Sequence, residues 1–163
     1  MNRLRLVILV AVLIPILFIA ANVLLYDSTP IASSPNAHYT SFSVGGKTFE
    51  LTYVATNQSE LAEGLMDKKV TYNTTELFVF PSAGYYPFWM FGVNSSLDIM
   101  WVDTPGGGNS GSFVYLALDA PTCQFSLSCA TFTPTVRADF VIEAKAGFAA
   151  ANGIKVGTPV TIS

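Results

Sequence analysis

The sequence predicts a mainly β fold, an antiparallel β-sandwich or jelly-roll-like barrel with two short helices, preceded by one transmembrane helix. Three observations support this class. About seven or eight short runs rich in β-branched and aromatic residues are bounded by Gly, Pro, Asn or Ser, which is typical of sandwiches and barrels. Charged residues make up only 12% of the 163-residue chain, so apolar surface is plentiful. A separate, mainly apolar stretch without charges stands near the N-terminus.

This stretch, residues 6–25, contains no charge, and about 20 such residues cross a hydrocarbon core of about 30 Å. A cleaved signal peptide is the alternative, but its apolar region usually has about 7 to 15 residues. Arg3 and Arg5 precede the stretch, and the first charge after it is Asp27. The positive-inside rule therefore predicts a cytoplasmic N-terminus (1–5), a single membrane span and an exterior domain at the cell membrane.

Residues 26–38 are rich in Ser, Pro and Ala and lack periodicity, so we expect a stalk there and the exterior domain at 39–163. Without Arg3 and Arg5, six of the eight Lys and Arg remain against 11 Asp and Glu. The domain side is therefore acidic, which disfavours a nucleic-acid partner.

The first elements of the domain are a hairpin and a short helix. Gly45–Gly46 between two β-rich runs predicts a two-residue turn. Asn57 can cap a helix with Glu60 three residues on, and Leu61 and Leu65 share one helical face.

The following strands are indicated by apolar, β-rich runs between turn residues. They are expected at residues 77–80, 86–91, 97–103, 113–119, 138–144 and near 159–162. Residues 104–112 contain several glycines and predict a hairpin loop. An Ala-rich run closed by Asn152–Gly153 predicts the second short helix.

The segment from Phe88 to Trp101 predicts a specific arrangement. Phe88–Phe91 has no polar alternation, so we expect a strand covered on both faces, whereas Leu97–Trp101 carries Asp98 and should have one face less buried. The short, turn-rich connection predicts that the two strands pair as a hairpin. This pairing would bring Asp98 close to Trp89.

Asp98 shares one side of its expected strand with Met100, and a carboxylate on an apolar face is costly unless it is bonded. Two interpretations stay open. Asp98 accepts hydrogen bonds from backbone amides or pairs with a Lys, or it is the polar anchor of an apolar groove walled by Trp89. The candidate ligand-binding residues are therefore Asp98, Trp89, Met100 and Glu143. A structural interpretation of Glu143 is a charge near the N-terminus of the helix that follows.

Cys123 and Cys129 are the only cysteines of the chain, and an even number at close spacing in an exterior domain predicts a disulfide. A zinc site would need further soft ligands, and the only histidine, His38, lies in the expected stalk. No metal and no cofactor are expected. Three sequons provide possible glycosylation sites at Asn57, Asn73 and Asn94.

Six short motifs extend over most of the exterior domain. They are GLM at 64–66, LFVFP at 77–81, FWM at 88–90, LDI at 97–99, VIEAKAGF at 141–148 and GIKVG at 153–157. In order and spacing the chain resembles the domain-of-unknown-function 192 (DUF192) family, over about residues 43–162. The resemblance implies a compact, mainly antiparallel β domain, frequently exported or membrane-anchored, with no established activity. The family commonly continues FWM with Lys-Asn-Thr, whereas Phe91-Gly92-Val93 stands here. If the polar trio forms part of a functional surface in relatives, this protein has lost or altered that surface.

The residues favour binding over catalysis. Because residues 39–163 contain no histidine, a Ser-His-Asp or Cys-His mechanism cannot be assembled. A carboxylate pair must stand about 5 to 10 Å apart across a groove to hydrolyse a glycoside, and the candidates are Asp98, Asp103, Asp119, Asp139 and Glu143. We expect a membrane-anchored domain that binds a small or extended ligand beside Trp89, or a neighbouring envelope protein. The alternative is a hydrolase of envelope carbohydrate that uses paired carboxylates.

Overall fold

The computed structural model describes residues 38–125 and 129–163. The expected cytoplasmic N-terminus (1–5), the membrane span (6–25) and all of the stalk except His38 lie outside the described residues. In the part of the chain that is described, no helix has the length and hydropathy that a membrane span requires.

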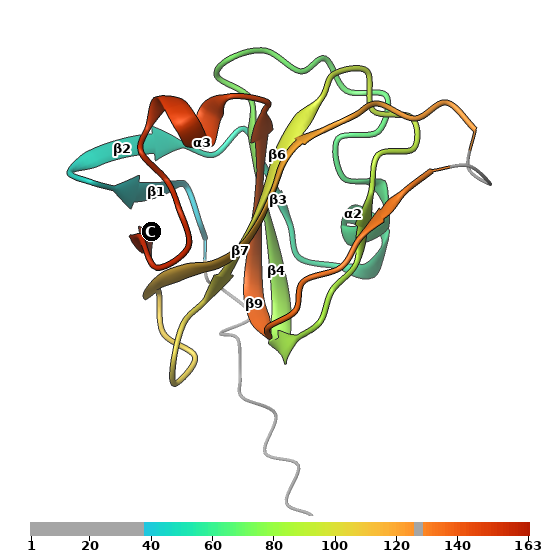
Figure 1. Cartoon of the computed structure of the whole chain (residues 1–163). Helices are drawn as coiled ribbons and strands as arrows, with labels where there is room; N and C mark the ends of the chain where they lie inside the picture. Colours follow the sequence, from blue (N-terminus) through green and yellow to red (C-terminus); the bar gives the residue numbers. More distant parts are fainter. Residues whose placement is uncertain (1–37, 126–128) are drawn as a thin grey trace, which may run out of the picture. The chain divides into compact units, whose positions relative to one another are not determined.

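One eight-stranded sheet forms the frame of the domain (Figure 1), with the strand order β2-β1-β10-β7-β6-β9-β4-β3. Its strands are β1 (Ser41–Val44), β2 (Lys47–Glu50), β3 (Tyr53–Ala55), β4 (Thr75–Gly84), β6 (Leu97–Asp103), β7 (Ser110–Ala120), β9 (Ala138–Lys145) and β10 (Pro159–Ile162). A separate two-stranded ribbon, the β5–β8 ribbon, joins β5 (Phe88–Trp89) to β8 (Thr131–Phe132). The helices of the described residues are α2 (Gln58–Glu63) and α3 (Phe148–Ala151). A mainly β fold with two short helices is therefore confirmed.

The sheet is mixed and open, so the predicted antiparallel sandwich or jelly-roll-like barrel is wrong. β3 runs parallel to β4, with Val54 opposite Leu77. Parallel neighbours need a crossover of about a dozen residues or more, and residues 56–74, which include α2, form that crossover. The sequence indicated the helix, but a helix does not by itself reveal that the strands on either side of it are parallel.

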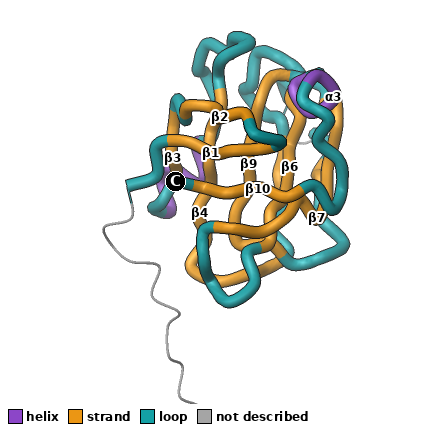
Figure 2. The backbone as a smooth tube through the Cα atoms, turned by 90° about the vertical axis from the view of Figure 1, so that its left-hand side faces the viewer, coloured by secondary structure: helices purple, strands orange, loops and turns teal. Residues whose placement is uncertain are grey.

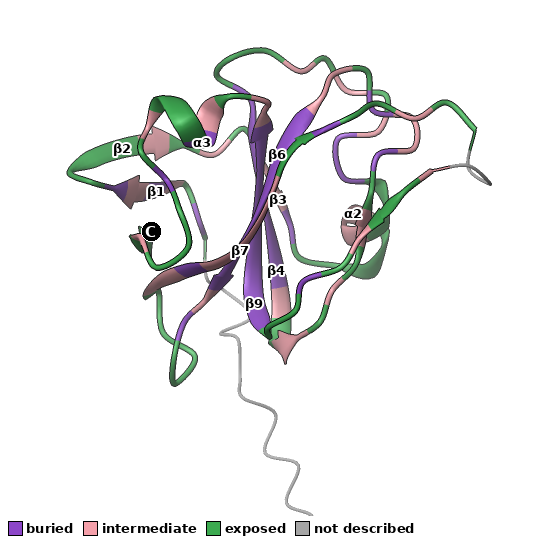
Figure 3. Cartoon of the chain, viewed as in Figure 1, coloured by how far each residue is buried: buried purple, intermediate pink, exposed green. Residues whose placement is uncertain are grey.

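Apolar cores lie on both faces of the central strands β4, β6 and β9. On one face these strands pack against β1 and β10, on the side that faces the viewer in Figure 2. This first core includes Phe42, Leu77, Met100, Ile142, Val160 and Ile162. The second core lies on the opposite face and includes Leu65, Phe78, Met90, Ile99, Trp101 and Val141. Burial on both sides makes the central strands the most enclosed part of the domain (Figure 3).

Local signals in the sequence produce the expected turns and helix ends. Asn57 accepts hydrogen bonds from the amides of Ser59 and Glu60 at 3.1 Å, and Glu60 bonds back to the Asn57 amide, which forms a capping box. Gly45 and Gly46 have φ values of 56° and 80° in the turn between β1 and β2, a conformation that glycine adopts without steric cost. These short-range predictions are confirmed.

The expected hairpin between Phe88–Phe91 and Leu97–Trp101 is wrong. β5 pairs with β8, and β6 pairs with β7 and β9. Because β6 already has a partner on each edge, it has no free edge for β5. The burial is reversed as well, because Trp89 is 44% exposed while every residue from Leu97 to Val102 is buried.

The predicted disulfide between Cys123 and Cys129 is present, with the two Cα atoms 5.5 Å apart. It lies in the connection between β7 and β8. Phe91 forms an isolated bridge with Cys123, and the Gly92 amide donates to the Cys123 carbonyl at 3.1 Å. The disulfide-bonded loop therefore contacts the chain immediately after β5.

Asp98 links three elements inside the first core. Its Oδ1 accepts from the Asp119 amide at 3.0 Å and its Oδ2 from the Ala149 amide at 2.9 Å. Ala149 lies in the first turn of α3, whose N-cap, Gly147, has no side chain to cap the helix. Asp98 therefore provides that cap from β6. The interpretation of Asp98 as a bonded structural carboxylate agrees with this geometry.

We predict that Asp98→Asn destabilises the fold by about 2 kcal/mol or more, because an amide can accept only one of the two backbone hydrogen bonds and leaves the other donor buried without a partner. Urea denaturation measures this loss. Asp119→Asn is the matched control, since the Asp119 side chain is exposed and its positive φ suits asparagine. Equal stability of Asp98→Asn and the wild type would contradict the structural role.

Candidate functional site

Among the cavities of the domain, two that are larger than a third one beside Asp103 and Asp139 lie on opposite sides of the central sheet. The smaller, which we call the Trp89 pocket, has a volume of about 290 Å³. Its lining residues are mostly apolar or aromatic and include Leu65, Met66, Phe78, Phe80, Tyr86, Phe88, Trp89, Phe91, Glu63 and Glu143. The larger cavity, about 670 Å³, lies between β2, the end of β9 and α3.

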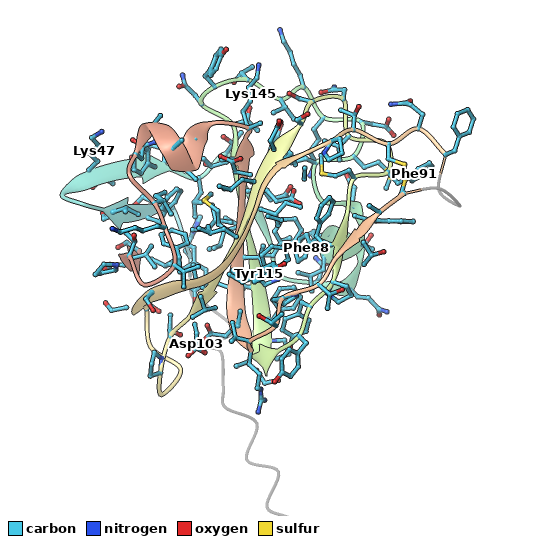
Figure 4. All side chains as sticks on the ribbon, viewed as in Figure 1. Lys47, Phe88, Phe91, Asp103, Tyr115 and Lys145 are labelled. Atoms are coloured by element: carbon cyan, nitrogen blue, oxygen red, sulfur yellow. A yellow bond between two sulfur atoms is a disulfide. The ribbon has the colours of Figure 1, made fainter. Side chains whose placement is uncertain are left out.

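The aromatic wall of the Trp89 pocket is fixed by contacts with the second core. The Phe88 ring meets the rings of Phe78 and Trp101 edge to face, with centroids 4.8 and 5.5 Å apart. Figure 4 shows Phe88 between the central strands and the outer segments. The Trp101 indole donates to the Tyr86 carbonyl at 2.9 Å, and this hydrogen bond holds the chain that leads into β5. Trp89, by contrast, is partly exposed and lies beside Phe91, with centroids 5.5 Å apart.

The GLM motif, at Gly64, Leu65 and Met66, closes the pocket from the side of α2. Gly64 has a φ of 50°, and a Cβ there would stand 3.2 Å from the Phe78 ring and 3.9 Å from Glu143 Oε2. The missing side chain lets the backbone approach both groups closely. The glycine therefore brings the end of α2 against the carboxyl group of Glu143.

Glu143 is the buried polar group of the pocket. It is 3% exposed, and no hydrogen bond to its carboxyl group is formed within residues 38–125 and 129–163. Burial and, to a smaller extent, the nearby Glu76 raise the pKa of Glu143 to about 8, although Lys68 opposes both effects. At neutral pH this carboxyl group is therefore largely protonated.

Glu76 lies directly opposite Glu143 in the register of β4 and β9, so the two side chains project from the same face of the sheet. Glu76 Oε1 is 3.5 Å from Lys68 Nζ, whereas Oε2 accepts no hydrogen bond from the described residues. Burial raises the pKa of Glu76 to about 7, although Lys68 lowers it. Lys68 also lies 3.8 Å from Glu63. The carboxyl groups of Glu63 and Glu76 thus share the ammonium group of Lys68.

The pair does not have the arrangement of a glycoside hydrolase. Such enzymes hold two carboxyl groups on opposite sides of a substrate groove, whereas Glu76 and Glu143 are adjacent on one face of the sheet and Glu76 does not line the pocket. The other acids considered from the sequence lie elsewhere. Asp119 is exposed, and buried Asp139 accepts hydrogen bonds from the amide and hydroxyl of Thr104.

The structure brings together two of the four predicted ligand-binding residues. Trp89 and Glu143 line the same pocket. Asp98 and Met100 lie on the opposite face of β6, so they do not share a groove with Trp89 as predicted. The structural interpretation of Glu143 as the acid near the following helix is also wrong, because Asp98 bonds to that helix instead. Sequence reasoning missed Glu76, whose one signal was a charge directly before the apolar run LFVF.

The three sequon asparagines are exposed, and their glycosylation stays a prediction. Asn57 Oδ1 caps α2, and Asn94 Nδ2 donates to the Lys68 carbonyl at 2.8 Å. Asn73 lies at the larger cavity.

The larger cavity has no buried, unpaired polar side chain among the residues described. Its charged groups are the exposed Glu50 and the half-buried Lys145, whose Nζ stands 4.3 Å above the Tyr72 ring. Its buried Thr75 hydroxyl donates to the Glu50 carbonyl at 2.6 Å. The Trp89 pocket is therefore the stronger candidate site, although it is smaller.

We predict that the free energy of unfolding falls as pH rises from about 5 to about 8. Glu143 has a folded pKa of about 8 against an ordinary value of 4.5, so the folded state binds more protons in this window and loses stability as they leave. One pKa unit corresponds to about 1.4 kcal/mol, so Glu143 accounts for about 3 to 5 kcal/mol. Urea denaturation across this pH range should show a clearly shallower decline for Glu143→Gln.

Glu50→Gln is the control for this measurement, because Glu50 is exposed and should leave the pH profile unchanged. Identical profiles for Glu143→Gln and the wild type would mean that Glu143 is ionised in the folded protein throughout this range.

Comparisons with known proteins agree with the resemblance seen in the motifs. The family model of DUF192, described as "Uncharacterized ACR", matches residues 40–162. A structure of a proposed transcription regulator from Sinorhizobium meliloti 1021 is 20% identical, with a TM-score of 0.61 over 76% of this chain and 92% of that chain. A protein of unknown function from Novosphingobium aromaticivorans DSM 12444 is 19% identical, with a TM-score of 0.61 over 81% of this chain and 91% of that chain.

Identities this low show a common fold alone. None of the curated proteins matches the chain. The family model, in contrast, covers nearly all of the described domain, from β1 to β10. The chain therefore belongs to the DUF192 family.

Proposed function

We propose that this domain is a ligand-binding module that takes up a small molecule in the Trp89 pocket. The observation that carries the proposal is Glu143, a buried carboxyl group without a hydrogen-bond partner among the described residues, in an aromatic-walled cavity. Buried polar groups are nearly always bonded. A ligand that hydrogen-bonds or pairs with Glu143 would provide the missing partner.

The cost of this arrangement supports a functional role. Burying a polar group without a hydrogen-bond partner generally costs several kcal/mol. A carboxyl group in a cleft with a strongly shifted pKa is also typical of a functional site. Asp98 shows that this fold can bond a buried carboxylate fully. Glu143 has no such partners, so its position is better explained by binding than by folding.

Binding fits better than hydrolysis. The two acids with the strongest pKa shifts, Glu76 and Glu143, are neighbours on one face of the sheet, and of these only Glu143 lines the pocket. The other carboxyl group of the lining belongs to Glu63 at the end of α2, which is exposed and lies 3.8 Å from Lys68 Nζ. The half-exposed Trp89 and its neighbour Phe91 instead provide a rim that a ligand can contact.

We also propose that the domain is exterior and anchored by residues 6–25. The charge-free stretch, the preceding Arg3 and Arg5 and the Cys123–Cys129 disulfide support this location.

Protease added to intact cells should therefore digest the domain, and peptides from the native protein should contain the linked cysteines. An abundant cytoplasmic protein is the control for cell integrity. The exterior location would be contradicted if the domain is digested only after the cells are lysed and both cysteines are found as freely alkylated thiols.

Ligand-observed NMR on the full-length protein tests the pocket itself, with a panel of small aromatic and aliphatic amines, alcohols and carboxylic acids as probes. Ala62→Phe should weaken binding of any true ligand at least tenfold, because Ala62 is an exposed residue of α2 that lines the Trp89 pocket. Ala151→Phe is the matched control, an exposed alanine of α3 that lines the larger cavity.

Binding lost in Ala151→Phe but kept in Ala62→Phe would place the ligand in the larger cavity. If no probe of the panel binds to the wild-type protein, the proposed binding function is wrong for these classes of molecule.

A further inference from the structure

We infer that the ligand of the Trp89 pocket is a small organic cation, an ammonium group with apolar substituents. The inference rests on the proposed function and names its ligand class. Its three supports are the charges of the lining residues, the aromatic faces beside them and the size of the cavity.

The described charged residues that line the pocket are all acidic. Glu63 and Glu143 line it, and no Lys, Arg or His is among its described lining residues. The nearest base, Lys68, stands outside the lining and is shared between Glu63 and Glu76, at 3.8 and 3.5 Å. The surroundings therefore hold three carboxyl groups and one ammonium group. These carboxyl groups would repel an anionic ligand, whereas a cationic ligand would supply the positive charge that balances them.

The aromatic rings suit the same ligand. The face of an aromatic ring carries negative potential and attracts a cation within about 6 Å, most strongly at tryptophan. Trp89 and Phe91 stand side by side at the pocket, inclined by 40°. Lys68 and Lys145 already lie 4.5 and 4.3 Å above the rings of Tyr53 and Tyr72 in this domain. A cation between Trp89 and Glu143 would therefore have both kinds of contact.

A polyhydroxylated ligand fits less well. Each sugar hydroxyl group needs a hydrogen-bond partner when it is buried, and most side chains of the lining are apolar. The Tyr86 hydroxyl already donates to the Ser82 carbonyl at 2.7 Å. The cavity of about 290 Å³ holds the volume of roughly ten water molecules. This space suits a small amine with a few carbon substituents.

Binding of a cation should release a proton. The charged groups that act on the pKa of Glu143 are Glu76 on β4 and Lys68 after α2, and Glu63 at the end of α2 lines the same pocket. Glu143 has a pKa of about 8, so only a small fraction of it is ionised at pH 6. An ammonium group beside it favours the ionised form and expels the proton to solvent. Affinity should therefore rise about tenfold per pH unit up to about pH 8 and then level off.

The test compares choline with 3,3-dimethylbutan-1-ol, its uncharged carbon isostere of the same shape, and with phenethylamine as a primary ammonium ion. Titration calorimetry on the full-length protein at pH 6, 7 and 8 measures the dissociation constants. We expect at least one of the two cations to bind ten or more times more tightly than the isostere at pH 8. We also expect that advantage to shrink about tenfold per pH unit on going down to pH 6.

In Glu143→Gln, most of the difference in affinity between cation and isostere should disappear, and so should the pH dependence of that difference. The reason is that the amide keeps the shape of the side chain and cannot ionise. Glu50→Gln, at the larger cavity, is the matched control and should change neither. Titrations in two buffers of different ionisation enthalpy should show about one proton released per cation bound at pH 7 in the wild type only.

If choline and its isostere bind equally well and Ala62→Phe blocks both, the inference that the ligand is a cation is wrong, whereas the proposed binding function of the pocket is supported. The same holds if only alcohols or acids of the panel bind. If neither the cations nor any other probe binds, the cation and the proposed function both fail. Preference for choline over phenethylamine, or the reverse, separates quaternary from protonated amines.

Discussion

The structure depends on the burial of β4, β6 and β9 on both faces. A strand enclosed on both sides has no solvent to satisfy its polar side chains, so each of them needs a partner inside the protein. Two buried acids of these strands lie between apolar neighbours, Asp98 on β6 and Glu143 on β9. Asp98 on β6 obtains two backbone amides, from β7 and α3. Glu143 on β9 obtains none from the described residues and faces a second acid, Glu76, across the strand pair. The same constraint thus yields a structural carboxylate on one face and a candidate site on the other.

The two faces differ in what covers them. On the first face, strands β1 and β10 belong to the same sheet and pack against the central strands, which leaves a core dominated by interdigitated aliphatic and aromatic side chains. On the second face, the cover consists of α2, the β5–β8 ribbon and connecting segments. A covering layer of short, irregular pieces packs less continuously than a sheet, and a pocket remains where α2 and β5 approach β9. Gly64 and the disulfide-bonded loop hold these pieces in place.

The departure from the family's usual FWM-Lys-Asn-Thr sequence has a structural consequence at this pocket. Phe91 and Val93 line it, and Gly92 lies so close to Met66 that a Cβ would stand 2.5 Å from Met66 Cγ. The chain therefore has an apolar wall at this position, and no cation among the described lining residues balances Glu143. A protonated Glu143 and an externally supplied cation are two ways to relieve the same imbalance.

The sequence by itself determined the features that depend on neighbouring residues: the β-rich class, the glycine turn at Gly45–Gly46, the capping box of Asn57 and Glu60, the disulfide and the alternation that separates Asp98 from Leu97 and Ile99. These arise from steric and hydrogen-bonding preferences within a few residues. The partner of β5, the parallel pairing of β3 with β4, and the meeting of Glu76 with Glu143 were decided only by the tertiary structure. Strand pairing joins segments that are far apart in the chain, and its free energy comes from burial on both faces, which no local pattern specifies. Of the candidate site, the sequence therefore identified Trp89 and Glu143 as unusual residues, whereas the fold decided that they share a pocket and that Asp98 does not.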